Sequence, residues 1–276
     1  MERIKLMVNG VPGNVAVTIV QGLLADERFE LVPFSLTGPE ITESEYRVGP
    51  ATIRLIRPAE RVTLTEQIKA EAGPFISIDF THPSAVNRNA EFYCACGLPF
   101  VMGTTGGDRE ALAAGVMASE ISAIIAPNMA KQIVGFQAMM EYAATTFPGL
   151  FEGYSLEVRE SHQNGKADTS GTARAMVGCF NRLGCAFSES EIRKERDPEV
   201  QIREWGVPKA HVTGHAWHTY TLVSEDGTAR FSFTHNINGR DIYVRGTLDA
   251  AVYLAEKVRQ GETGRVFSMI DVLKDS

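Results

Sequence analysis

The sequence predicts an α/β protein in two parts, first a parallel sheet covered by helices and then an α+β domain with a mixed or antiparallel sheet. Up to about residue 130, short apolar runs alternate with helical patterns, as in parallel strands that helices bury on both faces. A glycine turn follows the first apolar run. Later runs show strand-like alternation, and Asp226-Gly227 marks a hairpin turn. The first part is therefore expected to be a Rossmann-like dinucleotide-binding domain.

The elements of the first part follow from these apolar runs. Strands are expected at 4–10, 29–36 and 75–81, and the segments 99–107 and 122–129 each begin as a strand and end in a loop. Helices are expected at 15–29, 84–97 and 108–120. The order strand, glycine turn, helix, strand at the start is a βαβ unit.

The pattern of apolar and polar residues changes after residue 130. Helices are expected at 131–147, 172–184 and 247–261, with strands at 154–162, 218–224 and 229–237. The predicted domains are 1–130 for dinucleotide binding and 131–245 for substrate binding and oligomerisation. The segment 246–276 is expected to pack back on the first domain.

Composition limits the function classes. The chain has 276 residues, 44% hydrophobic and 22% charged, which is typical of a globular protein that folds without disulfides. A net charge of −7 argues against nucleic acid or an anionic membrane as a partner. No run of about 18 apolar residues and no secretory signal pattern is found, so we expect a cytoplasmic protein, or a plastid stromal one if a transit peptide is removed.

The cysteines do not form a recognisable site. Cys94 and Cys96 are spaced C-x-C, and Cys179 and Cys185 C-x5-C, which match no common zinc or redox motif. They are expected to be buried thiols in a reducing compartment, and no metal site is predicted.

The glycine turn VNGVPGNVA (8–16) keeps part of a dinucleotide fingerprint. Gly10 permits the tight turn, Gly13 permits close backbone approach, and Ala16 is small enough for helix packing, although Pro12 replaces the second glycine. An ordinary Gly-Pro turn is the alternative. The run 35–38 at the end of the second strand carries neither a carboxylate that would repel a 2′-phosphate nor an arginine that would bind one. NADPH is therefore tolerated and the preference stays open.

The stretch ESHQNGKADTSGTA (160–173) gathers acid/base and anion-binding groups between a strand and a helix. Lys166 offers a point charge for a carboxylate, and Ser170, Gly171 and Thr172 open a helix whose N–H groups can bind another. His162 can transfer a proton near neutral pH. A surface histidine beside a plain helix cap is the simpler interpretation of each feature alone. Their clustering favours a site for a small dicarboxylate.

These motifs resemble the 4-hydroxy-tetrahydrodipicolinate (dihydrodipicolinate) reductase family, and most closely its plant-type subgroup. The resemblance extends over DFTHPSAV, PFVMGTTGGDR, PNMAKQIV, GHAWH, HNINGR and MIDVL as well. It implies NADPH- or NADH-dependent reduction of 4-hydroxy-tetrahydrodipicolinate in diaminopimelate and lysine biosynthesis. Gln163 stands where bacterial members commonly have a second histidine, and D-T-S-G-T shortens their D-A-P-S-G-T, both as in plant-type members.

The resemblance also implies residue roles. His162 and Lys166 correspond to the catalytic acid/base and proton-donor residues. Substrate-binding positions are Lys166, Ser170, Gly171 and Thr172. Cofactor contacts correspond to three loops: Gly10, Val11, Pro12, Gly13, Asn14 and Val15; Gly103, Thr104 and Thr105; Ala126, Pro127, Asn128 and Met129. His235 and Arg240 are further candidates for substrate contacts. A homo-oligomer is expected, dimer or tetramer.

Two other functions are compatible with such a fold. A relative without catalytic activity could serve as a binding or assembly factor, but it would not need His162, Lys166 and the Ser-Gly-Thr turn together. The other is a different NAD(P)H enzyme, such as an amino-acid or semialdehyde dehydrogenase. A semialdehyde dehydrogenase needs a cysteine nucleophile, and no cysteine lies in a loop expected to meet the nicotinamide. The reductase is therefore the favoured hypothesis.

Overall fold

The computed structural model describes residues 2–166 and 168–275. The chain divides into two compact units. Unit 1 comprises the chain up to Val134 together with the segment from Asp241 onward, and unit 2 comprises Gly135–Arg240. The sequence analysis placed these divisions at 130/131 and 245/246. Each unit is built around its own sheet.

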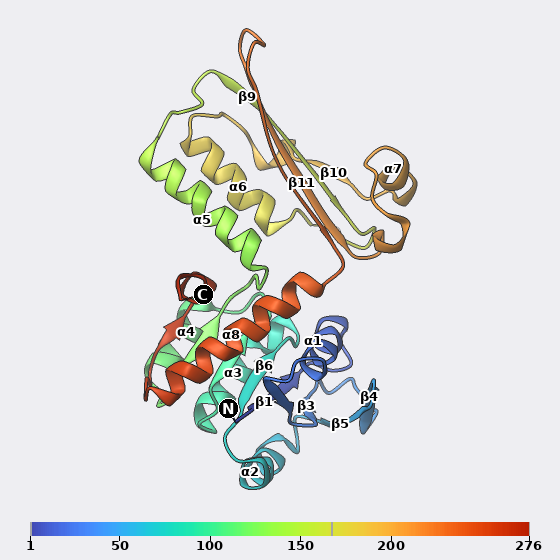
Figure 1. Cartoon of the computed structure of the whole chain (residues 1–276), viewed down its shortest axis with the longest axis vertical. Helices are drawn as coiled ribbons and strands as arrows, with labels where there is room; N and C mark the ends of the chain where they lie inside the picture. Colours follow the sequence, from blue (N-terminus) through green and yellow to red (C-terminus); the bar gives the residue numbers. More distant parts are fainter. Residues whose placement is uncertain (1, 167, 276) are drawn as a thin grey trace. The chain divides into compact units, whose positions relative to one another are not determined.

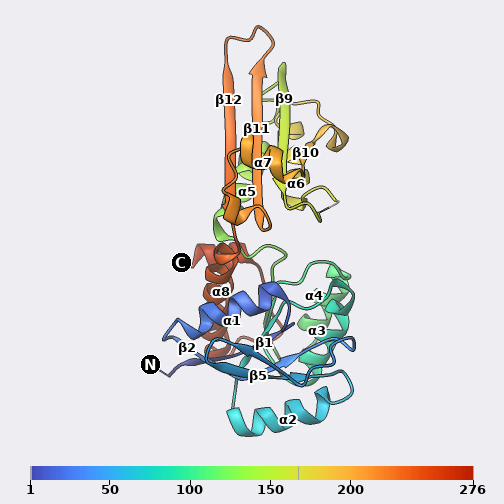
Figure 2. The same cartoon turned by 90° about the vertical axis from the view of Figure 1, so that its right-hand side faces the viewer.

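Unit 1 contains a six-stranded parallel sheet in the order β13-β8-β7-β6-β1-β2. Its strands are β1 (Ile4–Asn9), β2 (Phe29–Leu31), β6 (Ile76–Asp79), β7 (Phe100–Met102), β8 (Ala123–Ile125) and β13 (Val266–Phe267). Its helices are α1 (Asn14–Leu24), α2 (Arg61–Ala72), η1 (Pro83–Ala85), α3 (Val86–Ala95), α4 (Arg109–Met117), α8 (Asp241–Arg259) and α9 (Met269–Lys274). Figure 1 shows α8 beside α1, and Figure 2 shows α3 beside α4.

The sheet of unit 1 is buried on both faces. Leu6 and Val8 belong to one hydrophobic cluster, with residues of α1 and α8, whereas Met7 belongs to a second cluster with residues of α3 and α4. Neighbouring strand residues point to opposite faces, so a strand packed on both sides is apolar at most of its positions. This is why the strands appear in the sequence as largely apolar runs.

The segment 29–36 is two strands, and the prediction of a single strand there was wrong. β2 ends at Leu31, and β3 (Phe34–Leu36) pairs with β5 (Ala51–Ile56) in a separate sheet of order β3-β5-β4. Pro33 lies between them; it has no N–H to donate to a sheet and its φ is fixed, so it interrupts pairing there. Neither β4 (Glu45–Val48), β5 nor α2 was predicted.

The helix α8 begins at Asp241, earlier than the expected residue 247. Gly246 allows it to lie against the loop after β8, because a Cβ at this position would be 1.7 Å from the carbonyl oxygen of Met129. The close approach explains why a glycine is tolerated inside a long helix.

Unit 2 has a four-stranded sheet in the order β10-β9-β11-β12. The strands are β9 (Tyr154–His162), β10 (Arg193–Glu195), β11 (His215–Ser224) and β12 (Arg230–Asn238), and the helices are α5 (Lys131–Thr146), α6 (Gly171–Arg182), η2 (Glu189–Glu191), α7 (Pro198–Arg203) and η3 (Lys209–His211). β9, β11 and β12 are antiparallel, and β10 runs parallel to β9. Figure 1 shows α5 and α6 on one side of this sheet.

The face of this sheet that α5 and α6 cover is apolar over most of its length. Val158, Tyr220 and Leu222 are buried there with Phe180 of α6. Side chains two positions apart on a strand share a face, so Glu160 and His162 continue the face of Val158 toward the end of β9. The polar site described below lies at that end. Within the described part of the chain, no helix is long and apolar enough to cross a membrane.

Candidate active site

A cavity of about 1060 Å³ opens in unit 1 where β1 and β6 end. Its lining includes five residues of the predicted cofactor turn: Gly10, Val11, Pro12, Gly13 and Asn14. Further walls come from the loops after β3 and β6 and from the starts of α2 and α3. The carboxyl ends of parallel strands are where open α/β sheets bind ligands.

Two glycines shape the floor of this cavity. Gly10 has a φ of +104°, and a Cβ there would be 2.2 Å from the carbonyl oxygen of Phe80. Gly13 precedes the first residue of α1, and no side chain caps that helix. The first-turn N–H groups of α1 are thus left for an anion, and the missing side chains leave room for it. The residues present fit the pyrophosphate of a dinucleotide.

Charged groups that the sequence analysis did not assign also line the cavity. Arg61 comes from the start of α2 and Arg88 from α3, while Glu40 lies just beyond Gly38. They lie outside the end of the second strand, where a ribose or phosphate ligand was expected. No sequence signal marked Arg61, because α2 was not predicted and only the tertiary structure places its start beside the cavity.

A buried carboxylate ties the cavity loop after β6 to the loop after β7. Asp79 accepts hydrogen bonds from the hydroxyls of Thr104 (2.6 Å), Thr81 (2.8 Å) and Tyr93 (2.7 Å). The side chain of Thr104 is therefore occupied inside the protein, whereas Thr105 is exposed. Val15 and the predicted loops 103–105 and 126–129 are not among the described residues that line the cavity.

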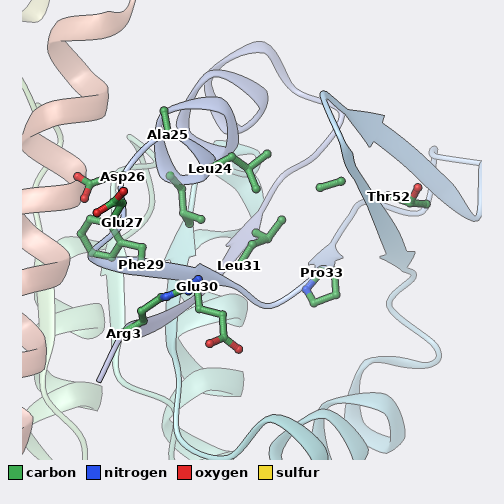
Figure 3. A pocket seen from close by; sticks show the side chains of 12 residues that line it. Arg3, Leu24, Ala25, Asp26, Glu27, Phe29, Glu30, Leu31, Pro33 and Thr52 are labelled. Atoms are coloured by element: carbon green, nitrogen blue, oxygen red, sulfur yellow. The ribbon is translucent and has the colours of Figure 1, made fainter. Parts of the chain in front are cut away.

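A second hollow, of about 780 Å³, lies at the other end of α1 (Figure 3). Leu23, Leu24 and Ala25 line it together with the carboxylates of Glu27 and Glu30. The carboxyl end of a helix and acidic side chains both disfavour a phosphate. The first cavity is therefore the better candidate for the cofactor.

In unit 2, four polar side chains gather at the end of the helix-covered face of the sheet. The strand register places Glu160 opposite His218 and His218 opposite His235, and His162 lies two residues beyond Glu160 on the same face. Glu160 is fully buried, and His162 and His218 are nearly so. Three strands thus bring one carboxylate and three imidazoles together.

Glu160 is held by groups from two other elements. Arg196, just after β10, forms a buried ion pair with its Oε1, and the backbone N–H of Ser170 donates to its Oε2 over 3.1 Å. Arg196 also donates to the carbonyl oxygen of Lys166 over 2.8 Å. One arginine therefore connects the end of β9 with the loop that leads to α6.

His162 is in contact with His218. Their Nε2 atoms are 3.3 Å apart, and the ring of His218 stacks on His235 with centroids 4.6 Å apart. Burial, together with the positive charges of Arg196 and Lys166, lowers the pKa of His162 to about 3. Burial and the neighbouring His235 and His162 also hold the pKa of His218 well below its usual value. Both imidazoles are neutral at pH 7 in the free protein.

Lys166 and the start of α6 provide the cationic side of the site. The Nζ atom of Lys166 is 2.8 Å from the exposed carboxylate of Asp168. α6 begins at Gly171 after Ser170, and no side chain caps its first N–H groups. These groups and the Lys166 ammonium can each bind a carboxylate, and displacing Asp168 costs little because surface ion pairs are weak.

Gln201 and His215 hold the end of β9 by two further contacts. Gln201 of α7 is fully buried and donates to the carbonyl oxygen of His162 over 2.7 Å. On the other face of the sheet, the hydroxyl of Ser161 is 2.8 Å from Nε2 of His215. The backbone that carries His162 is therefore held rigidly.

Glu160, His162 and His218 could also act as metal ligands, since their ligand atoms lie within 4.8 Å of one another. The surroundings disfavour a cation. Arg196 already neutralises Glu160, and the positive charges of Arg196 and Lys166 reach His162. An acid/base site is the better interpretation of this cluster.

Comparison with known proteins identifies the family of this chain. The family model "Dihydrodipicolinate reductase, N-terminus" matches residues 4–129, and "Dihydrodipicolinate reductase, C-terminus" matches residues 133–273. The chain belongs to the dihydrodipicolinate reductase family. As a member it is an oxidoreductase of diaminopimelate and lysine biosynthesis, which confirms the family that the sequence motifs indicated.

Relatives of this dihydrodipicolinate reductase family member include plant proteins. It is 45% identical over 273 residues to 4-hydroxy-tetrahydrodipicolinate reductase 2, chloroplastic, of Arabidopsis thaliana, covering 99% of this chain and 78% of that one. It is 44% identical over 270 residues to the probable reductase 2, chloroplastic, of Oryza sativa subsp. japonica, covering 98% and 83%.

Solved structures confirm the predicted fold class. The dipicolinate-bound dihydrodipicolinate reductase from Paenisporosarcina sp. TG-14 superposes with a TM-score of 0.67 at 20% identity, over 97% of this chain and 98% of that one. An aspartate semialdehyde dehydrogenase II of Vibrio cholerae reaches a TM-score of 0.50 at 13% identity, over 94% and 99%. At such identities the likeness shows the fold alone.

The structure brings together the predicted substrate-site residues of this dihydrodipicolinate reductase family member, and adds others. His162, Lys166, Ser170, Gly171 and Thr172 lie at or after the end of β9. The sequence analysis missed the residues that hold them: Glu160, Arg196, Gln201 and His218. Glu160 and His218 lie within the motifs ESHQNGKADTSGTA and GHAWH but were given no role, whereas Arg196 and Gln201 lie in no motif. The position of Glu160 on the same strand face as His162 was a usable signal.

Proposed function

We propose that the protein reduces 4-hydroxy-tetrahydrodipicolinate to tetrahydrodipicolinate with loss of water, using NADPH or NADH. One observation carries the proposal. A buried histidine, a lysine and an uncapped helix start lie together in unit 2, within a chain whose unit 1 has a cavity lined by the glycine turn before α1. A bound nicotinamide would supply the hydride; the chain's own residues bind the substrate and handle its proton.

The substrate carboxylates are bound by two kinds of group. One pairs with the ammonium of Lys166, replacing Asp168, and the other accepts hydrogen bonds from the N–H groups of Gly171 and Thr172 at the start of α6. Both groups also stabilise the negative charge that develops toward the ring nitrogen during reduction. The relative whose structure contains dipicolinate binds a planar dicarboxylate.

Substrate binding also prepares His162 for proton transfer. In the free protein the positive charges of Arg196 and Lys166 help to keep the pKa of His162 at about 3. A dicarboxylate paired with Lys166 cancels part of this repulsion, so the pKa of His162 rises when the substrate arrives. Pairing of the substrate with Lys166 thus makes His162 easier to protonate, and Lys166, an ammonium, is the second proton source.

The charges of the unit 1 cavity support a preference for NADPH. Arg61 and Arg88 offer two guanidinium groups to a 2′-phosphate, and Glu40 offers one carboxylate that suits a 2′-hydroxyl instead. We expect Arg88→Met to lower kcat/KM for NADPH and leave that for NADH unchanged. Glu40→Gln should raise the NADPH/NADH ratio. An unchanged ratio in both variants would contradict this assignment.

The proposal extends to assembly and location. Met139 and Tyr142 of α5, together with Phe147 and Leu150 beyond it, each expose more than half of their surface, and β12 is an edge strand. Such a patch and an open edge favour pairing with a second copy, so we propose a homo-oligomer built through unit 2. Sedimentation of a Tyr142→Glu variant against the wild type tests it.

The compartment is cytoplasm or, as the names of the plant relatives suggest, plastid stroma.

A coupled assay tests the activity. The protein is mixed with pyruvate, aspartate semialdehyde and the synthase that condenses them, and the absorbance of NADPH or NADH is followed. Oxidation that requires both the synthase and this protein supports the proposal. His162→Gln should lose turnover while NADPH still binds. Absence of oxidation with either cofactor, in a folded protein that binds NADPH, would overturn the proposal.

A further inference from the structure

The contact between His162 and His218 requires a defined proton arrangement. Their Nε2 atoms are 3.3 Å apart, and both rings are neutral near pH 7. A neutral imidazole has one N–H donor and one bare acceptor nitrogen. A hydrogen bond between the two Nε2 atoms therefore needs a proton on one of them and none on the other.

A second contact of His162 decides which nitrogen carries the proton. The ring of His162 is hydrogen-bonded to the backbone of His215, and this bond raises the pKa of His162 against the effect of burial. A contact that favours the protonated base comes from a carbonyl oxygen, which only accepts. Because Nε2 faces His218, the N–H that meets this carbonyl is Nδ1–H. The single proton of neutral His162 is thus used, and its Nε2 is the acceptor.

We propose that His218 is a positioning residue whose Nε2–H donates to Nε2 of His162 and holds that ring in the Nδ1-protonated tautomer. The assignment leaves Nδ1 of His218 without a proton, and that buried atom has no hydrogen-bond partner among the described residues. The inference rests on the proposed role of His162. It adds which nitrogen of neutral His162 carries the single proton, and which residue decides it.

The surroundings of His218 suit an orienting role. Strand pairing places it directly opposite Glu160 on one side and His235 on the other. Its Nε2 lies 3.9 Å from Oε2 of Glu160, and its ring stacks on His235. The carboxylate favours a donor at Nε2 over a bare lone pair, because an N–H dipole points its positive end at the negative charge. Glu160, which also pairs with Arg196, therefore favours a proton on Nε2 of His218.

Nitrogen-15 NMR of the histidine rings tests the arrangement in the wild type. Protonated and bare ring nitrogens have well-separated shifts, and the signals of His162 are identified by their loss in His162→Gln. We expect Nδ1 of His162 to be protonated and its Nε2 bare at pH 7. A protonated Nε2 on His162 would overturn the proposal, whether or not the protein shows reductase activity.

A matched pair of variants tests the donor itself. His218→Gln keeps an N–H donor close to the position of Nε2, and His218→Met has a similar length without one. We expect His218→Met to lose the defined tautomer of His162 and to lower kcat roughly 10- to 100-fold, the scale seen when the partner of an orienting histidine is removed. The KM for NADPH should stay unchanged. His218→Gln should keep the tautomer and most of kcat.

His235→Phe is the control for packing. It keeps a ring against His218 and removes two nitrogens that have no hydrogen-bond partner in the described residues. We expect it to leave the tautomer of His162 unchanged, with thermal unfolding showing that all variants fold. Equal effects of His218→Gln and His218→Met, or loss of the tautomer in His235→Phe, would overturn the proposal. An inactive wild type with the expected tautomer would overturn only the proposed function.

Discussion

Two arginines near β10 make almost the same contact in very different surroundings. Arg196 pairs with Glu160, and Arg193 pairs with Glu157, so the partners are three residues apart on both strands. The side chains of Arg196 and Glu160 are 17% and 0% exposed, against 73% and 40% for Arg193 and Glu157. Replacing each arginine by methionine compares a buried ion pair with an exposed one in the same sheet.

The losses of unfolding free energy in Arg196→Met and Arg193→Met should differ several-fold. Arg196→Met leaves Glu160 as an unpaired charge with no solvent, and breaking a buried pair in this way costs about 3–5 kcal/mol. It also removes the donor to the carbonyl oxygens of Lys166 and Glu195. Arg193→Met removes a solvated pair that contributes about 0–1 kcal/mol. Because 1 kcal/mol shifts Tm by roughly 2–4 °C in a chain of this size, Arg196→Met should lower Tm by about 6–20 °C and Arg193→Met by at most a few degrees.

Urea unfolding followed by circular dichroism, with the tryptophan signal as a second probe of unit 2, measures both variants. Because the cost comes from the unpaired buried charge of Glu160, a second substitution should restore part of the stability. Adding Glu160→Gln to Arg196→Met removes the stranded charge, so the double variant should be more stable than Arg196→Met alone. Equal destabilisation by the two arginine variants, or no rescue, would refute the reasoning from burial.

Three further predictions concern the histidines, the glycine turn and the lysine. The folded pKa values of His162 and His235, about 3 and about 4, lie below the unfolded value near 6.5, so their contribution to stability is present above pH 6.5 and is lost as the pH falls toward 4. At pH 5 each should cost about 2 kcal/mol of unfolding free energy by urea titration, and a flat profile from pH 7 to 5 would contradict this. Gly10→Ala should abolish NADPH binding, measured by fluorescence titration, because the new Cβ would collide with the carbonyl oxygen of Phe80. Gly115→Ala in α4 is the control: the space around Gly115 is open, so this change should stabilise the protein by about 0.5–1 kcal/mol. Lys166→Met should weaken dipicolinate binding by calorimetry roughly 10- to 100-fold, with the exposed Lys194→Met as its control; unchanged affinity would remove Lys166 from the substrate site.

Much of the fold could be predicted because local patterns determine it. The apolar runs of β1, β6, β7 and β8 mark strands buried on both faces, and the run 154–162 coincides with β9. Two strands of the small sheet, β4 and β5, were missed, because exposed positions interrupt their apolar runs. Pro33 was the one local signal that the run 29–36 is interrupted.

By itself, the sequence determined the glycine turn, the histidine and lysine after β9, and the helix start at Gly171, because each depends on residues adjacent in the chain. Only the tertiary structure decided their partners. His218 lies 56 positions from His162, and Arg196 lies 36 positions from Glu160. The register of β9 with β11 and the course of the chain after β10 bring these pairs together. Register depends on the packing of whole strands, and burial sets the charge of each histidine, so neither can be deduced from a local motif.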